Sequence, residues 1–291
     1  MKKVLLFVGL VVISLLSLNQ VQANDKYLDK NYTEGQQQII KWPEKTGDLK
    51  KIETLGNTTK KPYSMMWSTD VVRTGKYSLR LEYRDNDCGQ DDCPRGDFKG
   101  QFGRTEVLWQ ANNRIESWTR FSVFVPKDTM HLQEGYTMFT QWKTSPKNNN
   151  NRCQAIPLLF MLSDKGIEIH KEPGDKDCTI TRDFIILNSE NFKGKWLDFV
   201  VHSKWSKKDD GFIHVWVNGN KEHEYHGMTL YKVDKQRLPE QRHNIYTGYK
   251  LKGHKQTQVI YFDAFYRAKN CKSLKLETLG YSCNTLTQTV K

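Results

Sequence analysis

The sequence predicts an all-β protein, organised as one antiparallel β-sandwich of the jelly-roll type. Eight segments of strand length alternate apolar or aromatic residues with polar ones, or form short apolar runs, and each is bounded by Gly, Pro, Asn or Asp. Helical periodicity is scarce, and neither an internal repeat nor a linker divides the chain. Strands that follow one another without helices between them favour two packed antiparallel sheets.

The expected strands are, in chain order, Tyr77–Arg84, Trp118–Val125, Tyr136–Lys143, Ile156–Leu162, Thr179–Leu187, Trp196–Trp205, Phe212–Val217 and Val259–Arg267. Gly103–Val107 is also typical of a strand. The pair Asn218-Gly219 predicts a two-residue hairpin turn. Only Glu34–Ile40 and Tyr231–Gln241 have spacings that suit a helical turn or two.

The first 23 residues have the pattern of a secretory signal peptide. Lys2 and Lys3 precede an uncharged apolar run, Val4–Leu18, and Val21-Gln22-Ala23 offers small residues for cleavage after Ala23. This apolar run of 15 residues is shorter than the roughly 20 that a membrane span needs. We therefore expect residues 24–291 to form one domain that is secreted or periplasmic.

The chain is strongly basic, with a formal net charge of +12, and +10 once Lys2 and Lys3 are removed. An excess of positive charge indicates which partners a protein binds rather than how it folds. Here it favours binding to a polyanion. The sequence has no block of like charges and no long basic amphipathic helix, which weakens the nucleic-acid and membrane alternatives. An acidic polysaccharide is the expected partner, bound by a monomer.

All six cysteines follow the signal peptide, and an even number in an oxidising compartment predicts disulfides. Proximity in the sequence favours the pairs Cys88–Cys93, Cys153–Cys178 and Cys271–Cys283. Zinc would need a second close pair of ligands, so no metal site is predicted. No cofactor is expected to be required; calcium is a weaker alternative at a group of aspartates, Asp85, Asp87, Asp91 and Asp92.

Polar residues two apart recur on several expected strands and share one strand face in each. The pairs are Arg104 and Glu106, Gln141 and Lys143, and His202 and Lys204, and a tyrosine-rich segment follows at Tyr246–Tyr249. Charged pairs make poor core material, because an unpaired buried charge is costly. A surface ion pair would explain any one of them alone. Together they predict that all of these residues line the floor of one binding site for an anionic ligand.

Several motifs occur in the order of a known family: Gly75-Lys76-Tyr77-Ser78-Leu79-Arg80, Gly103-Arg104-Thr105-Glu106, Gln141-Trp142-Lys143, Trp196–Ser206, Val215-Trp216-Val217-Asn218-Gly219, Tyr246–Tyr249 and Tyr261-Phe262-Asp263. The chain thereby resembles the concanavalin-like, jelly-roll polysaccharide lyases grouped with heparin lyase I and glucuronan lyase, and more distantly the alginate lyases. The resemblance covers roughly residues 65 to 268. Its tryptophan-rich block and its hairpin are mainly architectural.

The resemblance implies β-elimination on a chain that contains uronic acid. Arg104 and Gln141 would neutralise the uronate carboxylate while negative charge builds on it. Tyrosine suits the base and acid roles if nearby cations stabilise its phenolate. Tyr249 is the first choice for these roles and Tyr246 the second. Glu106 is expected to orient Arg104 rather than to transfer a proton.

The chain departs from the alginate-lyase pattern at the expected base, because Lys143 follows Gln141-Trp142 where those enzymes typically have a histidine. Either Lys143 helps to neutralise charge or the base comes from elsewhere, with His202 as the leading substitute. Gly248 and Tyr249 are adjacent here, whereas the family usually has one residue between them. The further candidates for substrate contact are Lys204, Lys250, Trp109 and Trp142.

Two other function classes suit a sandwich of this kind. A lectin-like module that binds carbohydrate without cleaving it would also use Arg104, Gln141 and aromatic residues. A retaining glycoside hydrolase needs two carboxylates about 5–5.5 Å apart. Only Glu106 is clearly placed for such a pair, which argues against the hydrolase.

Overall fold

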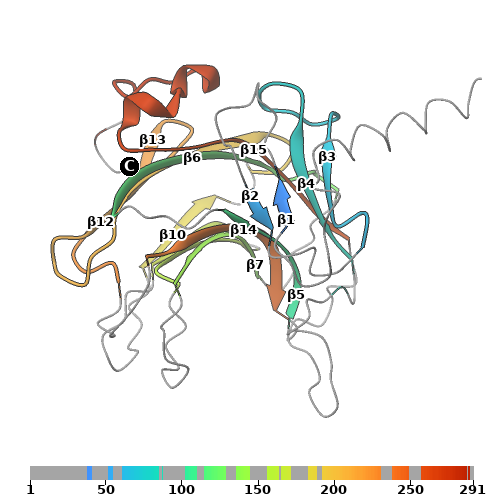
Figure 1. Cartoon of the computed structure of the whole chain (residues 1–291), viewed down its shortest axis with the longest axis horizontal. Coiled ribbons are helices and arrows are strands. Elements are labelled where there is room, and N and C mark those ends of the chain that lie inside the picture. Colours follow the sequence, from blue (N-terminus) through green and yellow to red (C-terminus); the bar gives the residue numbers. More distant parts are fainter. Residues whose placement is uncertain are drawn as a thin grey trace, which may run out of the picture.

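Two antiparallel sheets make up the computed structural model (Figure 1). It describes strand backbone at 38–40 and 52–54, and residues 61–84, 87, 102–109, 115–128, 136–144, 156–163, 165–171, 183–188, 192–230, 238–248, 257–286 and 288. Residues 1–23, with the expected signal peptide and its cleavage point, lie outside this set. No helix among the described residues is long and apolar enough to span a membrane.

The eight-stranded sheet is the inner of the two curved layers, and its open face is concave (Figure 1). From edge to edge its strands are β1 (Gln38–Ile40), β2 (Ile52–Thr54), β5 (Phe102–Trp109), β14 (Glu240–Gly248), β7 (Tyr136–Lys143), β8 (Leu158–Ser163), β9 (Gly166–Lys171) and β10 (Asp183–Asn188). The sheet therefore brings β5 and β7 to either side of β14.

The seven-stranded sheet covers the inner sheet from the other side (Figure 1). Its strands, in spatial order, are β13 (Asn220–His226), β12 (Phe212–Val217), β11 (Trp196–Lys204), β6 (Glu116–Phe124), β15 (Gln258–Ala268), β4 (Ser78–Tyr83) and β3 (Met65–Ser68). Neighbours such as β6, β11 and β15 are distant in sequence, as expected for a jelly roll rather than a simple meander.

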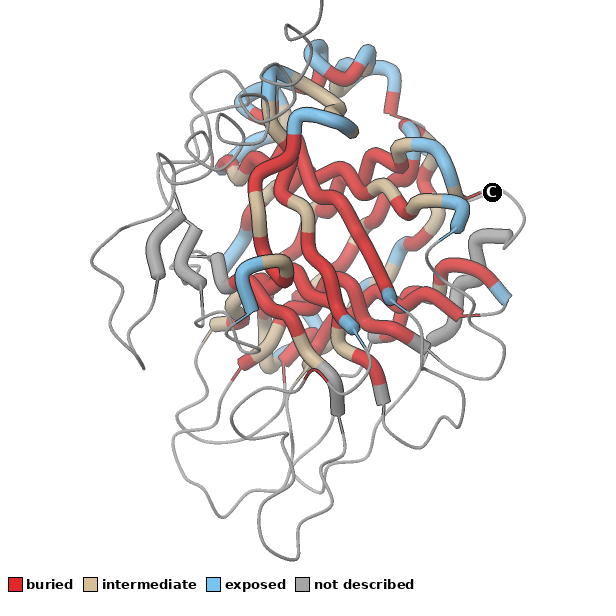
Figure 2. The backbone as a smooth tube through the Cα atoms, turned by 90° about the vertical axis from the view of Figure 1, so that its right-hand side faces the viewer, coloured by how far each residue is buried: buried red, intermediate tan, exposed pale blue. Residues whose placement is uncertain are grey.

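The hydrophobic core fills the space between the sheets, and buried positions run along most of the central strands (Figure 2). Phe121 of β6 stacks on Phe199 of β11, with ring centroids 5.0 Å apart. The same ring meets Trp142 and Phe160 of the opposite sheet, at 6.3 and 6.0 Å. These aromatic contacts join the two layers, because large rings bury the most apolar area per residue.

The expected all-β fold is confirmed, and most predicted strands match within a few residues. Tyr136–Lys143 and Phe212–Val217 have the predicted bounds. The Asn-Gly hairpin also forms: Asn218 and Gly219 have φ of 50° and 83° and join β12 to β13.

Two helical expectations need correction. Residues 38–40 of the segment Glu34–Ile40 are strand β1, because they pair with β2 at the sheet edge. Glu240 and Gln241 begin strand β14 rather than ending a helix, since they pair with Lys143 and Trp142 of β7. Residues 231–237 lie outside the described residues.

The segment after β15 covers part of the outer face of the seven-stranded sheet. It contains two 3₁₀ helices, Cys271–Leu274 and Leu276–Leu279, and Leu274 and Leu276 pack with Trp216 and Tyr266. The expected disulfide Cys271–Cys283 is present, with a Cα–Cα distance of 5.9 Å. A disulfide indicates an oxidising, extracytoplasmic location. The other four expected disulfide cysteines, Cys88, Cys93, Cys153 and Cys178, lie outside the described residues.

Candidate functional site

A group of polar residues lies on the open, concave face of the eight-stranded sheet. Strand alternation places it there. In β5 the Thr105 hydroxyl donates to the carbonyl of Glu82 in the other sheet at 3.1 Å, and Val107 belongs to the core. Arg104 and Glu106 therefore point the opposite way, to the open face. The expectation that these two residues share a face is confirmed.

Glu106 is fully buried and is the centre of this group. Its Oε1 accepts from Arg242 Nη1 at 2.9 Å and lies 3.5 Å from Arg104 Nη1. Its Oε2 accepts from Gln141 Nε2 at 3.0 Å and from Asn244 Nδ2 at 3.1 Å. One carboxylate thus fixes donors from β5, β7 and β14. We call Arg104, Glu106, Gln141, Arg242 and Asn244 the Glu106 cluster.

The charges around Glu106 keep its carboxyl group ionised. Burial alone raises the pKa of Glu106, but the charges of Arg242 and Arg104, the hydrogen bond from Asn244 and the charge of Lys143 outweigh burial and lower that pKa. Because Glu106 is buried while the Arg104 and Arg242 side chains are 18% and 10% exposed, the cluster offers cationic atoms to its surroundings. Such a surface suits an anionic ligand.

Tyr246 extends the cluster along β14. It is the strand partner of Arg104, and the Arg104 guanidinium lies 4.5 Å from the centre of the Tyr246 ring. Its ring packs against Met138 and Leu159, which are buried beside the charges. Flat aromatic surface beside cations is a suitable environment for a sugar ring that carries a carboxylate.

Sequence reasoning missed several members of this face. Arg242 and Asn244 continue the period-two series that ends at Tyr246, and this spacing was the signal that could have revealed them. Glu168 and His170 of β9 also face outward, because Ile167 and Ile169, which alternate with them along the strand, are in the core. The His170 Nε2 lies 2.9 Å from Glu168 Oε2.

His202 and Lys204 are not part of this face, so the expectation of a single floor needs correction. Both belong to β11 of the seven-stranded sheet, where Val201 faces the core and the neighbouring residues face outward. His202 stacks on Trp118 with ring centroids 4.0 Å apart and bonds Glu116 at 2.8 Å. Lys204 Nζ donates to Asp210 at 2.9 Å. A whole sandwich separates them from Arg104.

Trp142 lies in the core rather than on the open face, so its expected sugar contact needs correction. It alternates with Gln141 and Lys143, which face outward, and only 2% of it is exposed. We expect Trp142→Ala to lower the free energy of unfolding by about 3–5 kcal/mol, since it removes a large ring from the core. Chemical denaturation measures this loss; a value below about 1 kcal/mol would contradict the core assignment.

The structure describes the remaining candidate residues only in part. Tyr249 and Lys250 lie outside the described residues, and of Trp109 only the backbone, at the end of β5, is described. In the expected calcium loop, Asp87 accepts hydrogen bonds from the Tyr63 hydroxyl at 2.9 Å and the Arg84 N–H at 2.8 Å. Asp85, Asp91 and Asp92 lie outside the described residues.

Comparison with known proteins identifies the family. A family model described as polysaccharide lyase matches residues 44–266, which is more than half of the chain. The chain belongs to the polysaccharide lyase family. This confirms both the resemblance seen in the sequence and the expectation of an enzyme of this class. No curated protein matches the chain in sequence.

A solved lyase structure shares the fold, and two alginate lyases align with lower TM-scores. The endo-β-1,4-glucuronan lyase of the fungus Trichoderma reesei aligns with a TM-score of 0.56 at 14% identity, over 74% of this lyase and 91% of the fungal chain. Alginate lyase vAL-1 from Chlorella virus gives 0.48 at 16% identity, over 74% and 90%. Alginate lyase Aly36B, in complex with an alginate tetrasaccharide, gives 0.49 at 14%, over 74% and 86%.

Proposed function

We propose that this lyase is secreted or periplasmic and cleaves an anionic, uronate-containing polysaccharide by β-elimination. The observation that carries the proposal is the Glu106 cluster, in which one buried carboxylate holds two arginines and two amides on a concave sheet face. The T. reesei relative, named for its action on glucuronan, has the same fold. A cationic face on such a fold suits a polyuronate.

β-Elimination needs a group that stabilises negative charge next to the uronate carboxyl. A base removes the proton from the carbon beside that carboxylate, and a carbon–carbon double bond forms as the bond to the 4-linked oxygen breaks. A proton then goes to the departing oxygen. The intermediate charge spreads onto the carboxylate, so preorganised donors around it lower the barrier. Arg104 is placed for this role, because its guanidinium is partly exposed and held by Glu106.

The other roles follow from position on the face. Gln141 donates one N–H to Glu106, and we assign the second N–H of its amide to a substrate carboxylate. Tyr246, beside Arg104, and Tyr249, just beyond β14, are the proposed base and acid. Lys143 adds positive charge next to Gln141. We propose Lys250 and Trp109 as further substrate contacts, and leave out His202, Lys204 and Trp142, whose positions face elsewhere.

The experiment is incubation of the purified chain with separate polyuronates and glycosaminoglycans, including glucuronan and alginate. Elimination creates an unsaturated uronate whose conjugated double bond absorbs ultraviolet light. Hydrolysis and mere binding create no such bond. We expect absorbance to rise with at least one polymer for the wild-type enzyme and for His202→Gln. The rise should be lost when both Tyr246→Phe and Tyr249→Phe are introduced.

Two outcomes would count against the proposal. Shortened chains without new ultraviolet absorbance would indicate hydrolysis. Tight retention of a polyuronate without any cleavage would indicate a carbohydrate-binding module.

A further inference from the structure

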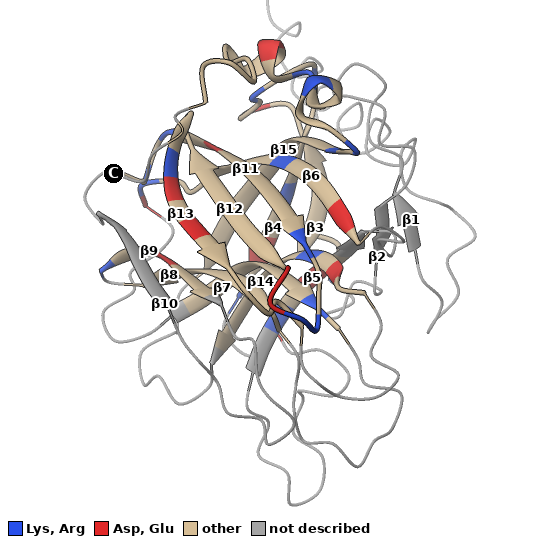
Figure 3. Ribbon diagram, turned by 90° about the vertical axis from the view of Figure 1, so that its left-hand side faces the viewer, with Lys and Arg blue, Asp and Glu red and all other residues tan. Residues whose placement is uncertain are grey.

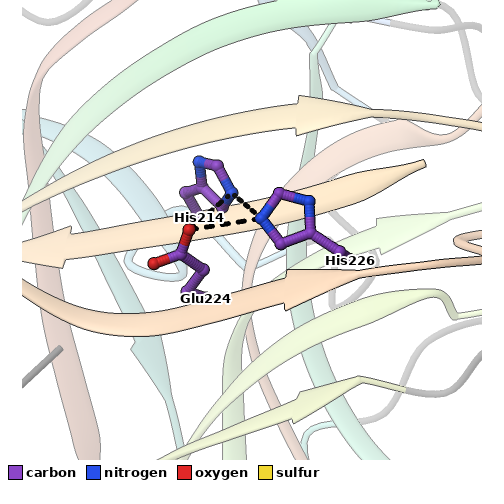
Figure 4. Close-up of side chains that lie close together, drawn as sticks. All are labelled: His214, Glu224 and His226. Carbon is purple, nitrogen blue, oxygen red and sulfur yellow. Dashed lines mark hydrogen bonds and ion pairs between the residues drawn. The ribbon is translucent and has the colours of Figure 1, made fainter. Parts of the chain in front are cut away.

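Three potential metal ligands meet on the outer face of the seven-stranded sheet. They belong to β12 and β13, the strands at one edge of that sheet (Figure 3). His214 of β12 pairs directly with Glu224 of β13. His226 follows Glu224 by two residues, so its side chain lies on the same face. Figure 4 shows the three side chains turned toward one another.

The donor atoms form a small, nearly equilateral triangle. His214 Nε2 lies 3.2 Å from His226 Nε2 and 3.5 Å from Glu224 Oε1, and His226 Nε2 lies 3.2 Å from the same oxygen. A zinc ion bound tetrahedrally at about 2.0–2.1 Å would hold its ligand atoms about 3.3–3.4 Å apart. The separations of the three donor atoms therefore match those around a zinc ion.

Glu224 presents one of its two carboxylate oxygens, Oε1, to both histidines. Lys221 Nζ binds the other oxygen, Oε2, at 3.1 Å and leaves Oε1 facing the histidines.

We propose that His214, Glu224 and His226 form a zinc site that links strands β12 and β13 at the edge of the sheet. Two imidazoles and one carboxylate are ligands typical of zinc, whereas calcium takes oxygen ligands. The fourth position faces solvent, because the side chains of Glu224 and His226 are 33% and 65% exposed. The site lies across the sandwich from the Glu106 cluster and is independent of the proposed lyase reaction. The sequence alone predicted no metal here.

The test is calorimetric titration of Zn²⁺ into the full chain, prepared without a histidine tag and freed of metal by chelation. The wild type should bind one zinc per chain. His226→Asn should weaken binding at least tenfold, and the largely exposed position should leave folding unaffected. The matched control is His202→Gln, a histidine of the same sheet face that bonds Glu116 instead. It should keep wild-type affinity.

A second readout uses Co²⁺ in place of zinc. Cobalt with three such ligands and a solvent molecule gives the visible absorption of a four-coordinate ion, and this band should be absent in His226→Asn. Zinc should also raise the thermal midpoint of the wild type but not of that variant. Substoichiometric binding, or equal weakening in His202→Gln and His226→Asn, would overturn the assignment.

Discussion

Replacing Arg104 with alanine should lower kcat on the best polyuronate by about 100- to 1,000-fold, the loss seen when one donor to a developing negative charge is removed. Arg104 is the cluster cation with the larger exposure, and its fork matches a carboxylate. Arg104→Lys should recover only part of the activity, because an ammonium cannot donate the paired hydrogen bonds. Steady-state kinetics by ultraviolet absorbance measure both variants.

Arg84→Ala is the matched control for this prediction. Arg84 also pairs with a glutamate, Glu82, and its guanidinium lies 3.7 Å from the centre of the Tyr63 ring, so it makes the same two kinds of contact as Arg104. It follows β4 of the other sheet. Its removal should leave kcat within about twofold. Equal losses in the two variants would show that the Arg104 effect does not come from substrate contact.

Replacing Glu106 with glutamine should lower the free energy of unfolding by about 3–5 kcal/mol, the cost of removing one partner from a buried ion pair. Arg104 and Arg242 would then face each other beside a neutral amide, whose single oxygen can accept from the arginines or from Gln141 and Asn244 but not from both sets. Activity should fall as well, because Arg104 would no longer be held in place. Denaturant unfolding and kinetics on the folded fraction separate the two effects.

The Glu106→Gln variant should also change how stability depends on pH. The folded pKa of Glu106 lies below its ordinary value of 4.5, so its stabilisation is present above that pH and is lost as pH falls through the folded pKa. Wild-type stability should therefore decline more steeply below pH 4.5 than that of Glu106→Gln. Glu240→Gln is the control, since Glu240 is a 25%-exposed partner of Arg242 and should cost about 1 kcal/mol or less. Parallel pH profiles would contradict the buried-charge account.

The fold could be predicted because the order of apolar and polar residues within each strand reflects which of its faces is buried. Alternation in Phe212–Val217 and the Asn-Gly turn after it fix a hairpin through local interactions alone. The pair Arg104 and Glu106 could be predicted for the same reason, because two residues of one strand share a face whatever the strand pairs with.

Which sheet a strand joins is decided by distant partners, and this the sequence does not reveal. Polar and apolar residues alternate around His202 as regularly as around Gln141. However, β11 pairs with β6 and β12 of the seven-stranded sheet, so His202 faces away from the Glu106 cluster. Arg242 was not predicted because β14 forms by pairing with β5 and β7, and its own sequence has no marked apolar alternation. Trp142, in contrast, could have been placed in the core from its two polar neighbours.

The central claim is that the Glu106 cluster recognises the carboxylate of a uronate. The most direct measurement compares the affinity for one polyuronate with that for the same polymer after its carboxyl groups are reduced to alcohols. We predict that the wild-type enzyme binds the charged polymer at least tenfold more tightly, that this preference collapses in Arg104→Ala, and that it persists in Arg84→Ala. An undiminished preference in Arg104→Ala, or none in the wild type, would contradict the claim.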